Sequence, residues 1–189
     1  MNVPPTVLFD LDGVLADFDT GLRERVAATY GPRWVINDAD RRSWSYADDY
    51  LAVHGDDAPD GITQVHRQPG FYRSLPPHVA AVDAFRTLAL RGWHTAICSA
   101  PSLSNPTCAS DKLAWVAHHL GSDAARHTVL TKDKTLVAGT YLLDDKLEIT
   151  GTHPPQWTHL LVSTATNRRG HYPHRFHRWK DLLKRIGDP

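Results

Sequence analysis

Two apolar segments of this chain each end in a pair of carboxylates. The first is TVLFDLD, in which Asp10 and Asp12 stand two residues apart, and the second is YLLDD, which ends in Asp144 and Asp145. Short apolar and β-branched runs that stop at polar residues are typical of buried strands. Carboxylates gathered at strand ends repel one another unless a cation or hydrogen-bond donors stabilise them. The sequence therefore predicts a sheet with up to four carboxylates at one edge.

Strands and helices alternate along the rest of the chain. Strands are expected at residues 6–11, 95–99, 127–131, 141–143 and 158–162, and helices at about 78–90, 110–120 and 178–186. This alternation predicts an α/β fold with a central parallel sheet flanked by crossover helices. Parallel sheets of this kind bind ligands at the carboxyl ends of their strands, where the acidic residues lie.

Residues 19–75 differ from the rest of the chain. They are rich in Trp, Tyr, Asp and Pro and contain no convincing buried parallel strand. We interpret them as a small insertion, and the predicted organisation is a core formed by residues 1–18 and 76–189 with a cap formed by residues 19–75.

Composition limits the partners and the compartment. The 21 basic and 21 acidic residues give no net charge, which does not favour binding to a nucleic acid polymer but allows small anionic substrates. Two cysteines, Cys98 and Cys108, are too few for a disulfide framework. The first residues lack the pattern of a signal peptide, and no apolar stretch approaches a membrane span of about 20 residues. These features predict a cytoplasmic protein that does not enter a membrane.

The acidic residues suggest a metal, and other strand ends suggest a phosphate site. Mg²⁺ prefers oxygen ligands and commonly accompanies phosphate, although a purely structural acidic turn is the alternative. Ser99 follows the predicted strand at 95–99, and its hydroxyl could bind a phosphate oxygen or simply cap a turn. Lys132 and Lys134 both follow a strand and could reach a phosphoryl group as point charges, or remain solvated.

The order of these motifs resembles the haloacid dehalogenase superfamily of phosphatases. FDLDGVLADF, DKLAWVAHHLG, LTKDKT and YLLDDK followed by ITG are similar to the 5'(3')-deoxyribonucleotidase family. The resemblance covers almost the whole chain and is most specific over residues 7–18 and 111–151. It implies a Rossmann-like core with a small, mostly helical cap inserted after the first strand.

The resemblance also implies roles for the acidic residues. Asp10 would be the nucleophile, and Asp12 would be the general acid and base, with its backbone carbonyl on Mg²⁺. Asp145 would be the distal metal ligand, and Asp144 would be a second acidic member of the same site.

The remaining roles implied by the resemblance concern the substrate. Ser99 and Ala100 would bind the phosphate, Lys134 would neutralise the phosphoaspartate, and Lys112 would lie near the substrate phosphate, with Lys132 a further candidate. Aromatic side chains near the cap would stack on the base, and the candidates are Phe18, Trp44, His66, Phe71 and Tyr72. The alternative is that these side chains form the cap's own small core.

Three positions depart from the family pattern. Ala100 replaces a hydroxyl residue in a Thr-Ser-Pro motif, Ser45 replaces an aromatic residue, and His66 stands where a tryptophan is expected. These departures leave the base and sugar preference open.

The sequence thus predicts a Mg²⁺-dependent phosphatase that hydrolyses nucleoside monophosphates through an aspartyl-phosphate. A phosphatase of the same fold for a sugar phosphate or a specialised metabolite is the alternative, and a non-catalytic phosphate-binding module is a weaker one. The oligomeric state, a homodimer included, is left open. His171, His174 and His177 recur every three residues and could form a metal or polyanion site, but Pro173 and the lack of a strand favour a solvated loop.

Overall fold

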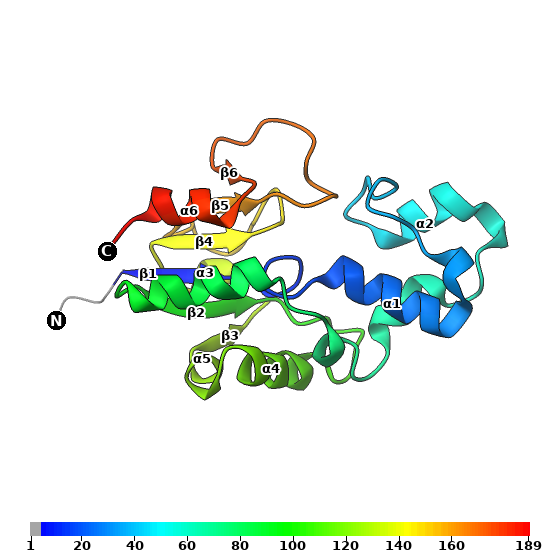
Figure 1. The fold of residues 1–189 in the computed structure, drawn as a ribbon, viewed down its shortest axis with the longest axis horizontal. Coiled ribbons are helices and arrows are strands. Elements are labelled where there is room, and N and C mark those ends of the chain that lie inside the picture. The colour runs from blue at the N-terminus through cyan, green and yellow to red at the C-terminus, as the bar shows by residue number, and fades with distance from the viewer. Residues whose placement is uncertain (1–4) are drawn as a thin grey trace.

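A six-stranded parallel sheet forms the centre of the computed structural model, which describes residues 5–189 (Figure 1). Its strand order is β3-β2-β1-β4-β5-β6. The strands are β1 (Thr6–Phe9), β2 (His94–Ser99), β3 (Thr128–Leu130), β4 (Tyr141–Asp144), β5 (Thr158–Val162) and β6 (Arg175–Phe176). Every neighbouring pair is parallel, which confirms the predicted α/β class.

The register of the three central strands brings their carboxyl ends together. Phe9 pairs with Ile97 of β2 on one side and with Leu143 of β4 on the other. The Asp10 amide then donates to the Leu143 carbonyl at 2.8 Å. As a result Asp10, Ser99 and the end of β4 lie at the same edge of the sheet, because parallel strands in register end together.

Helices cover the sheet and account for the apolar character of its central strands. The helices of the core are α3 (Val79–Leu90), α4 (Cys108–His119), α5 (Ser122–Arg126) and α6 (Trp179–Ile186). On one face, Phe9 contacts Phe85 of α3 at a ring-centroid distance of 5.1 Å and stacks with Trp179 of α6 at 6.4 Å. The other face has a smaller apolar cluster that includes Leu8, Leu142 and Trp157.

The predicted cap lies beyond the carboxyl edge of the sheet, on the side away from the C-terminus (Figure 1). With its flanking residues it contains α1 (Phe18–Tyr30), α2 (Tyr46–His54) and four short 3₁₀ helices, Pro32–Trp34, Gly55–Asp57, Ile62–Arg67 and Tyr72–Ser74. No strand occurs among these residues, as predicted.

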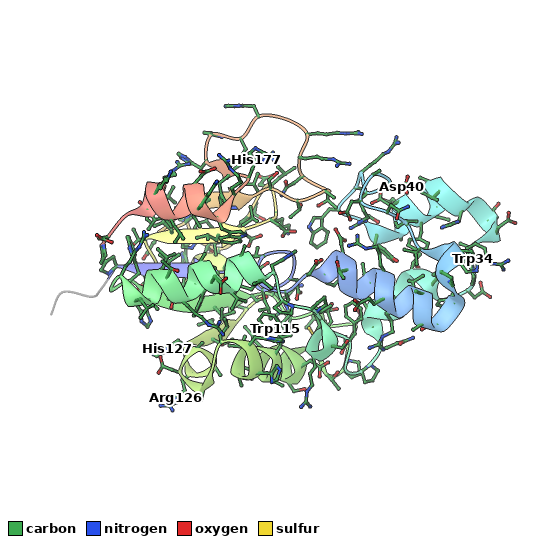
Figure 2. The ribbon with its side chains drawn as sticks, in the orientation of Figure 1. Trp34, Asp40, Trp115, Arg126, His127 and His177 are labelled. Atoms are coloured by element: carbon green, nitrogen blue, oxygen red, sulfur yellow. The ribbon has the colours of Figure 1, made fainter. Side chains whose placement is uncertain are left out.

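The chain enters and leaves this segment at one place. The Asp17 amide donates to the Pro76 carbonyl and the His78 amide donates to the Leu15 carbonyl, both at 2.8 Å. Nearby, buried Trp115 on α4 donates from Nε1 to the Leu75 carbonyl at 2.7 Å (Figure 2). The two segments that connect residues 19–75 to the core are therefore fixed to one another and to the core.

Three details differ from the expectations. The first strand was expected to reach residue 11 but ends at Phe9, because the Leu11 carbonyl accepts turn hydrogen bonds from residues 14–16. The loop expected at 171–177 contains β6, whose Phe176 is buried against Trp179 at 5.1 Å, so that expectation is wrong there. Helix α5 was not predicted, since five residues are too few to show a helical period.

No helix within residues 5–189 is long and apolar enough to cross a membrane. Cys98 and Cys108 are both buried free thiols. Burial raises the pKa of Cys98 to about 12 and also raises that of Cys108, so neither is a reactive thiolate at neutral pH.

Candidate active site

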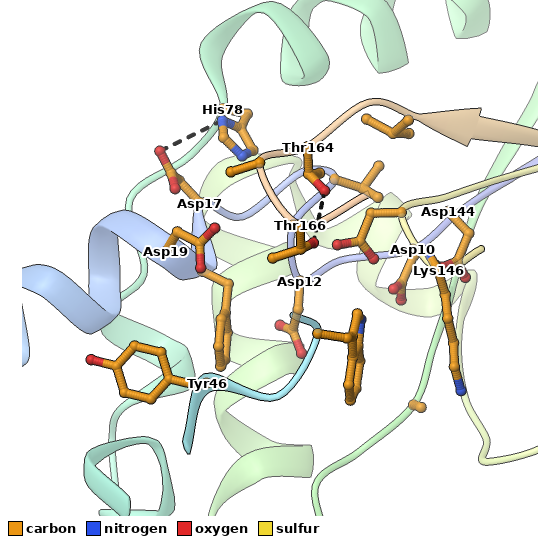
Figure 3. Close-up of a pocket in the computed structure, with 18 of the residues that line it drawn as sticks. Asp10, Asp12, Asp17, Asp19, Tyr46, His78, Asp144, Lys146, Thr164 and Thr166 are labelled. Carbon is orange, nitrogen blue, oxygen red and sulfur yellow. Dashed lines mark hydrogen bonds and ion pairs between the residues drawn. The ribbon is translucent and has the colours of Figure 1, made fainter. Parts of the chain in front are cut away.

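A cavity of about 660 Å³ opens at the carboxyl edge of the sheet, between the sheet and the predicted cap (Figure 3). Asp10, Asp12, Lys134, Asp144 and Asp145 all line it. The structure therefore brings the two acidic motifs and both candidate lysines, Lys132 included, to a single cavity.

Asp10 lies directly after β1 and is 9% exposed. Its Oδ1 is 2.9 Å from Lys134 Nζ. Burial acts to raise the pKa of Asp10, but the positive charges of Lys134 and Lys112 hold that pKa below its ordinary value. Asp10 is accordingly an anion at neutral pH, which is the form that can act as a nucleophile.

Asp12 has a different environment although it is only two residues away. Its Oδ2 is 2.8 Å from Nζ of Lys112, a fully buried lysine on α4. Its Oδ1 is buried without a hydrogen-bond partner among the described residues. Burial raises the pKa of Asp12, the neighbouring Asp10 charge adds to this, and Lys112 only partly offsets it. Neighbouring carboxyls whose pKa values are driven apart are suited to separate roles as nucleophile and acid.

Lys112 also organises the end of β2. Its Nζ donates to Ser99 Oγ and to the Ala100 carbonyl, each at 2.8 Å. Ala100 lines the cavity, whereas Ser99 and Lys112 lie behind its surface. Lys112 thus holds Asp12 and the segment after β2 in one arrangement.

Lys134 is positioned by a turn at the end of β3. The Asp133 carboxylate accepts hydrogen bonds from the Thr135 amide at 3.0 Å and from the Thr152 amide at 2.8 Å. Lys134 follows, 7% exposed, and pairs with Asp144 as well as with Asp10. Burial acts to lower the pKa of Lys134, but the two carboxylates raise it above its ordinary value, so the ammonium stays charged.

Asp144 and Asp145 complete an acidic cluster with Asp10. One carboxylate oxygen from each of the three lies within 4.8 Å of the other two. Burial, together with the Asp10 charge, raises the pKa of Asp144 to about 6. Burial and the two other carboxylates raise the pKa of Asp145 well above its ordinary value. The Asp145 carboxylate has no hydrogen-bond or ion-pair partner within residues 5–189. Three clustered carboxylates, of which only Asp10 and Asp144 pair with Lys134, suit a hard divalent cation.

Gly13 allows Asp145 to approach the turn after β1. Gly13 has φ +74°, and a Cβ built on it would lie 2.5 Å from Asp145 Oδ2. Replacing it with any other residue would strain the backbone and displace this carboxylate.

We expect Gly13→Ala to weaken Mg²⁺ binding as well as to cost about 1–2 kcal/mol of stability from the left-handed backbone. Gly70→Ala is the matched control, because Gly70 has φ +78° but open space around its Cβ. Urea denaturation and Mg²⁺ titration of both variants provide the measurement. Equal Mg²⁺ affinity in the two variants would show that the contact with Asp145 does not matter.

Comparison with known proteins agrees with this geometry. The family profile described as "5' nucleotidase, deoxy (Pyrimidine), cytosolic type C protein" matches residues 4–186, nearly the whole chain. The chain belongs to the 5'(3')-deoxyribonucleotidase family. The human cytosolic 5'(3')-deoxyribonucleotidase is 35% identical over 187 residues, which cover 96% of this chain and 92% of that protein. A Bordetella pertussis protein provisionally named as a 5'(3')-deoxyribonucleotidase is 38% identical over 165 residues, covering 86% and 85%.

Solved structures show the same fold at much lower identity. The HAD-hydrolase YfnB of Bacillus subtilis, solved bound to magnesium, superposes with a TM-score of 0.60 at 12% identity. The match covers 98% of this chain and 99% of that one, which supports the haloacid dehalogenase fold for this deoxyribonucleotidase-family chain.

Several of the residues predicted to bind the substrate line the cavity. Phe18, Trp44, His66 and Lys132 line it together with Ala100. Phe18 packs edge-on against buried Phe71 at 5.5 Å. Trp44 is 68% exposed, and Lys146 Nζ lies 5.6 Å from its ring. Phe18, the first residue of α1, and Trp44, which precedes α2, therefore line the cavity from two different segments.

Tyr72 does not line the cavity. It is 4% exposed and lies behind Phe18, with their ring centroids 6.2 Å apart. Lys112 Nζ lies 5.4 Å from its ring, so Tyr72 packs between Phe18 and the buried lysine. This placement gives Tyr72 a packing contact with Phe18 and Phe71 and no surface toward the cavity.

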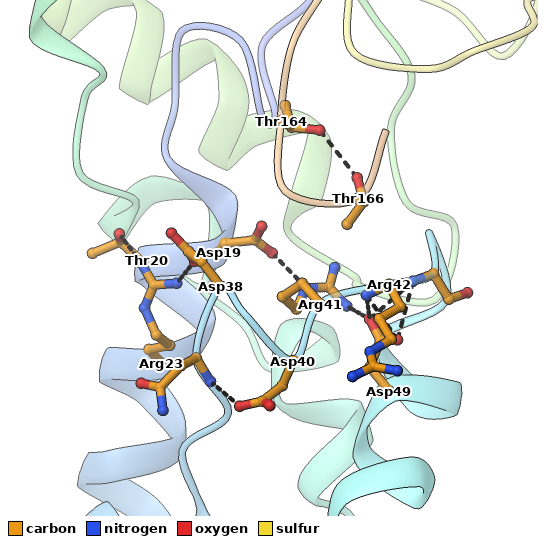
Figure 4. A network of polar contacts seen from close by, with 12 residues as sticks. Asp19, Thr20, Arg23, Asp38, Asp40, Arg41, Arg42, Asp49, Thr164 and Thr166 are labelled. Carbon is orange, nitrogen blue, oxygen red and sulfur yellow. Dashed lines mark hydrogen bonds and ion pairs between the residues drawn. The ribbon is translucent and has the colours of Figure 1, made fainter. Parts of the chain in front are cut away.

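Two polar groups at the cavity were missed by the sequence reasoning. In the cap, 5% exposed Arg41 donates from Nε to Asp19 at 3.2 Å and pairs with buried Asp49 (Figure 4). After β5, the hydroxyls of Thr164 and Thr166 lie 3.1 Å from one another, and both residues line the cavity (Figures 3 and 4). These partners are distant in sequence or lie in an irregular loop, so no periodicity or motif could have revealed them.

Proposed function

We propose that this chain hydrolyses nucleoside monophosphates to a nucleoside and inorganic phosphate, through a phosphate ester of Asp10. The observation that carries the proposal is the contrast between two neighbouring carboxyls. Asp10 is held as an anion by Lys134 at 2.9 Å, while burial favours a protonated Asp12. A binding module would gain nothing from this separation, whereas covalent phosphoryl transfer requires it.

The chemistry proceeds in two displacements at phosphorus. In the first, an Asp10 carboxylate oxygen forms a bond to phosphorus and the bond from phosphorus to the nucleoside oxygen breaks. Asp12 gives its proton to the leaving oxygen, which departs as the nucleoside alcohol. In the second, Asp12 takes a proton from water as the water oxygen bonds to phosphorus. The bond from phosphorus to Asp10 then breaks, which releases phosphate and regenerates the carboxylate.

Electrostatic support comes from the buried lysines and from Mg²⁺. Lys134 offsets the repulsion between Asp10 and the phosphate dianion, and Lys112 holds Asp12 in place. Asp10, Asp144 and Asp145, with the Asp12 backbone carbonyl, would hold Mg²⁺. When bound, Mg²⁺ supplies positive charge that neutralises the phosphoryl oxygens.

The aromatic side chains support a nucleoside as the leaving group. We assign residues 19–75 as a cap whose Trp44 and His66 line the cavity together with the catalytic carboxylates. Burial and the nearby Arg67 charge lower the pKa of His66, so its ring is neutral and can stack. Stacking of a base on an aromatic side chain contributes roughly 1–3 kcal/mol and tolerates different bases.

A substrate panel tests the proposal. We expect 5'- and 3'-deoxyribonucleotides or ribonucleotides to be hydrolysed with higher kcat/KM than sugar phosphates of similar charge, in the presence of Mg²⁺. Phe18→Ala and Trp44→Ala are expected to reduce kcat/KM for nucleotides by about 5- to 150-fold, the kinetic equivalent of the stacking energy. The same variants should hydrolyse aliphatic phosphate esters, which have no base to stack, at nearly the wild-type rate. Faster turnover of a sugar phosphate than of every nucleotide would contradict the proposed substrate class.

A further inference from the structure

The loop after β5 contains one buried side chain that the chemistry above does not use. Residues 163–166 of this loop line the cavity, and Asn167 follows them at 3% exposure. An asparagine buried in this way must satisfy a carbonyl and an amide group through hydrogen bonds with its surroundings.

Both ends of the Asn167 side chain are fully engaged. Its Nδ2 donates to the Asp145 carbonyl at 2.6 Å and to the Val162 carbonyl at 2.7 Å. Its Oδ1 accepts from the Thr164 amide at 3.0 Å and from Arg175 Nη1 at 2.9 Å. A single amide therefore ties the end of β5, the turn of the loop and the start of β6 to the residue after β4.

The residue that Asn167 holds is the member of the acidic cluster with the least other support. Asp144 pairs with Lys134 and also accepts from the Lys146 amide at 2.9 Å. The Asp145 carboxylate has no such partner within the described chain, so its position depends on its backbone. Gly13 leaves room for the Asp145 carboxylate, and Asn167 fixes the Asp145 backbone through its carbonyl.

We propose that Asn167 is a positioning residue that sets the Asp145 backbone and thereby the affinity of the acidic cluster for Mg²⁺. The inference rests on the metal site of the proposed function. Partners that orient metal ligands without touching the metal commonly change its affinity by 10- to 100-fold when they are replaced.

The alternative is that Asn167 only satisfies loop carbonyls and has no connection with the metal. The chain contains a matched example of that simpler role. Asn105 is 4% exposed, its Nδ2 donates to the His66 and Gln68 carbonyls at 2.9 and 2.7 Å, and its Oδ1 accepts from the Thr107 amide at 2.9 Å. Asn105 has the same hydrogen-bonding pattern but does not touch the acidic cluster.

The test compares Asn167→Asp with Asn105→Asp. Each substitution keeps the shape of the side chain but removes both N–H donors of its amide group. Calorimetric titration of the metal-free proteins with MgCl₂, without substrate, measures the Kd, and thermal melting measures stability. We expect both variants to lose stability to a similar degree. Only Asn167→Asp should bind Mg²⁺ about 10-fold more weakly than the wild type. An unchanged Mg²⁺ Kd in a folded Asn167→Asp protein, or an equal weakening in Asn105→Asp, would overturn the proposal.

Arg175→Gln provides a second variant if Asn167→Asp does not fold. This substitution weakens the hydrogen bond that Asn167 Oδ1 accepts from residue 175 and leaves the Asn167 side-chain amide in place. Mg²⁺ should then bind more weakly than in the wild type, and an unchanged Kd would overturn the proposal.

The wild-type titration separates this inference from the proposed function. A wild type that binds Mg²⁺ but hydrolyses no nucleotide removes the proposed substrate and leaves the comparison of variants valid. A wild type that shows no saturable Mg²⁺ binding overturns both.

Discussion

Asp10→Asn is expected to reduce Mg²⁺-dependent release of phosphate from nucleoside monophosphates by about 10³-fold or more, in line with the loss of a nucleophile in other covalent hydrolases. The amide has nearly the same shape as the carboxylate but is a far weaker nucleophile. It also gives up the ion pair with Lys134, which keeps Asp10 anionic in the wild type. Phosphate release at saturating nucleotide and Mg²⁺ is the measurement.

Asp111→Asn is the matched control for this substitution. Asp111 is 6% exposed on α4 and accepts a hydrogen bond from the Thr107 hydroxyl at 2.7 Å, which an asparagine can also accept. We expect it to retain most of the wild-type rate. Retention of more than a few per cent of activity by Asp10→Asn would contradict covalent catalysis.

Lys134→Met is expected to be the most destabilising substitution at the site. Lys134 is the cation shared by Asp10 and Asp144, and its removal leaves two buried carboxylates facing one another. Breaking a buried ion pair by removing one partner costs about 3–5 kcal/mol. Urea denaturation of the metal-free protein should show a loss of that size at pH 7.5, and phosphatase activity should fall with it.

The cost of Lys134→Met should also depend on pH. Without the ammonium, the pKa of Asp144, already about 6, rises further above the unfolded value, and the pKa of Asp10 loses the main charge that keeps it low. The folded protein then takes up a proton more readily than the unfolded chain. The deficit in stability should then shrink as the pH falls from 7.5 to about 5, where that proton is bound. Lys132→Met is the control, because Lys132 is exposed and has no ion-pair partner among residues 5–189. Its stability should differ from that of the wild type by about 0.5 kcal/mol or less, as is usual for surface substitutions. A deficit that is the same at both pH values would show that Lys134 does not act through its charge.

The parts of the fold and site that lie on apolar strands could be predicted from the sequence. The runs before Asp10, Asp144 and Ser99 have a clear apolar character, and parallel strands must end at one edge, so the residues after them had to meet. Lys134 could be selected only with the help of the family resemblance, since Lys132 qualified equally by position.

The parts that depend on packing between distant segments could not be predicted. Lys112 lies in the middle of an amphipathic helix, and nothing in its spacing indicates that it is fully buried beside Asp12 and Ser99. Arg41 meets Asp19 only because two cap segments pack together. Strand β6 has two residues and appears as a strand only through its pairing with β5. Each of these features is determined by tertiary contact, which local propensity does not encode.

The most direct test of the mechanism is to trap the phosphoryl group on the protein. Wild-type protein and Asp12→Asn protein are mixed with Mg²⁺ and an aryl phosphate that carries a radioactive phosphoryl group, and the reaction is stopped with acid during turnover. The leaving group of an aryl phosphate needs no proton, so Asp12→Asn should still form the intermediate but hydrolyse it slowly. We predict that the label accumulates on Asp10, more in Asp12→Asn than in the wild type, and is absent from Asp10→Asn. Label on a different residue, or full turnover without label on the protein at any time, would contradict the assignment of Asp10 as the nucleophile.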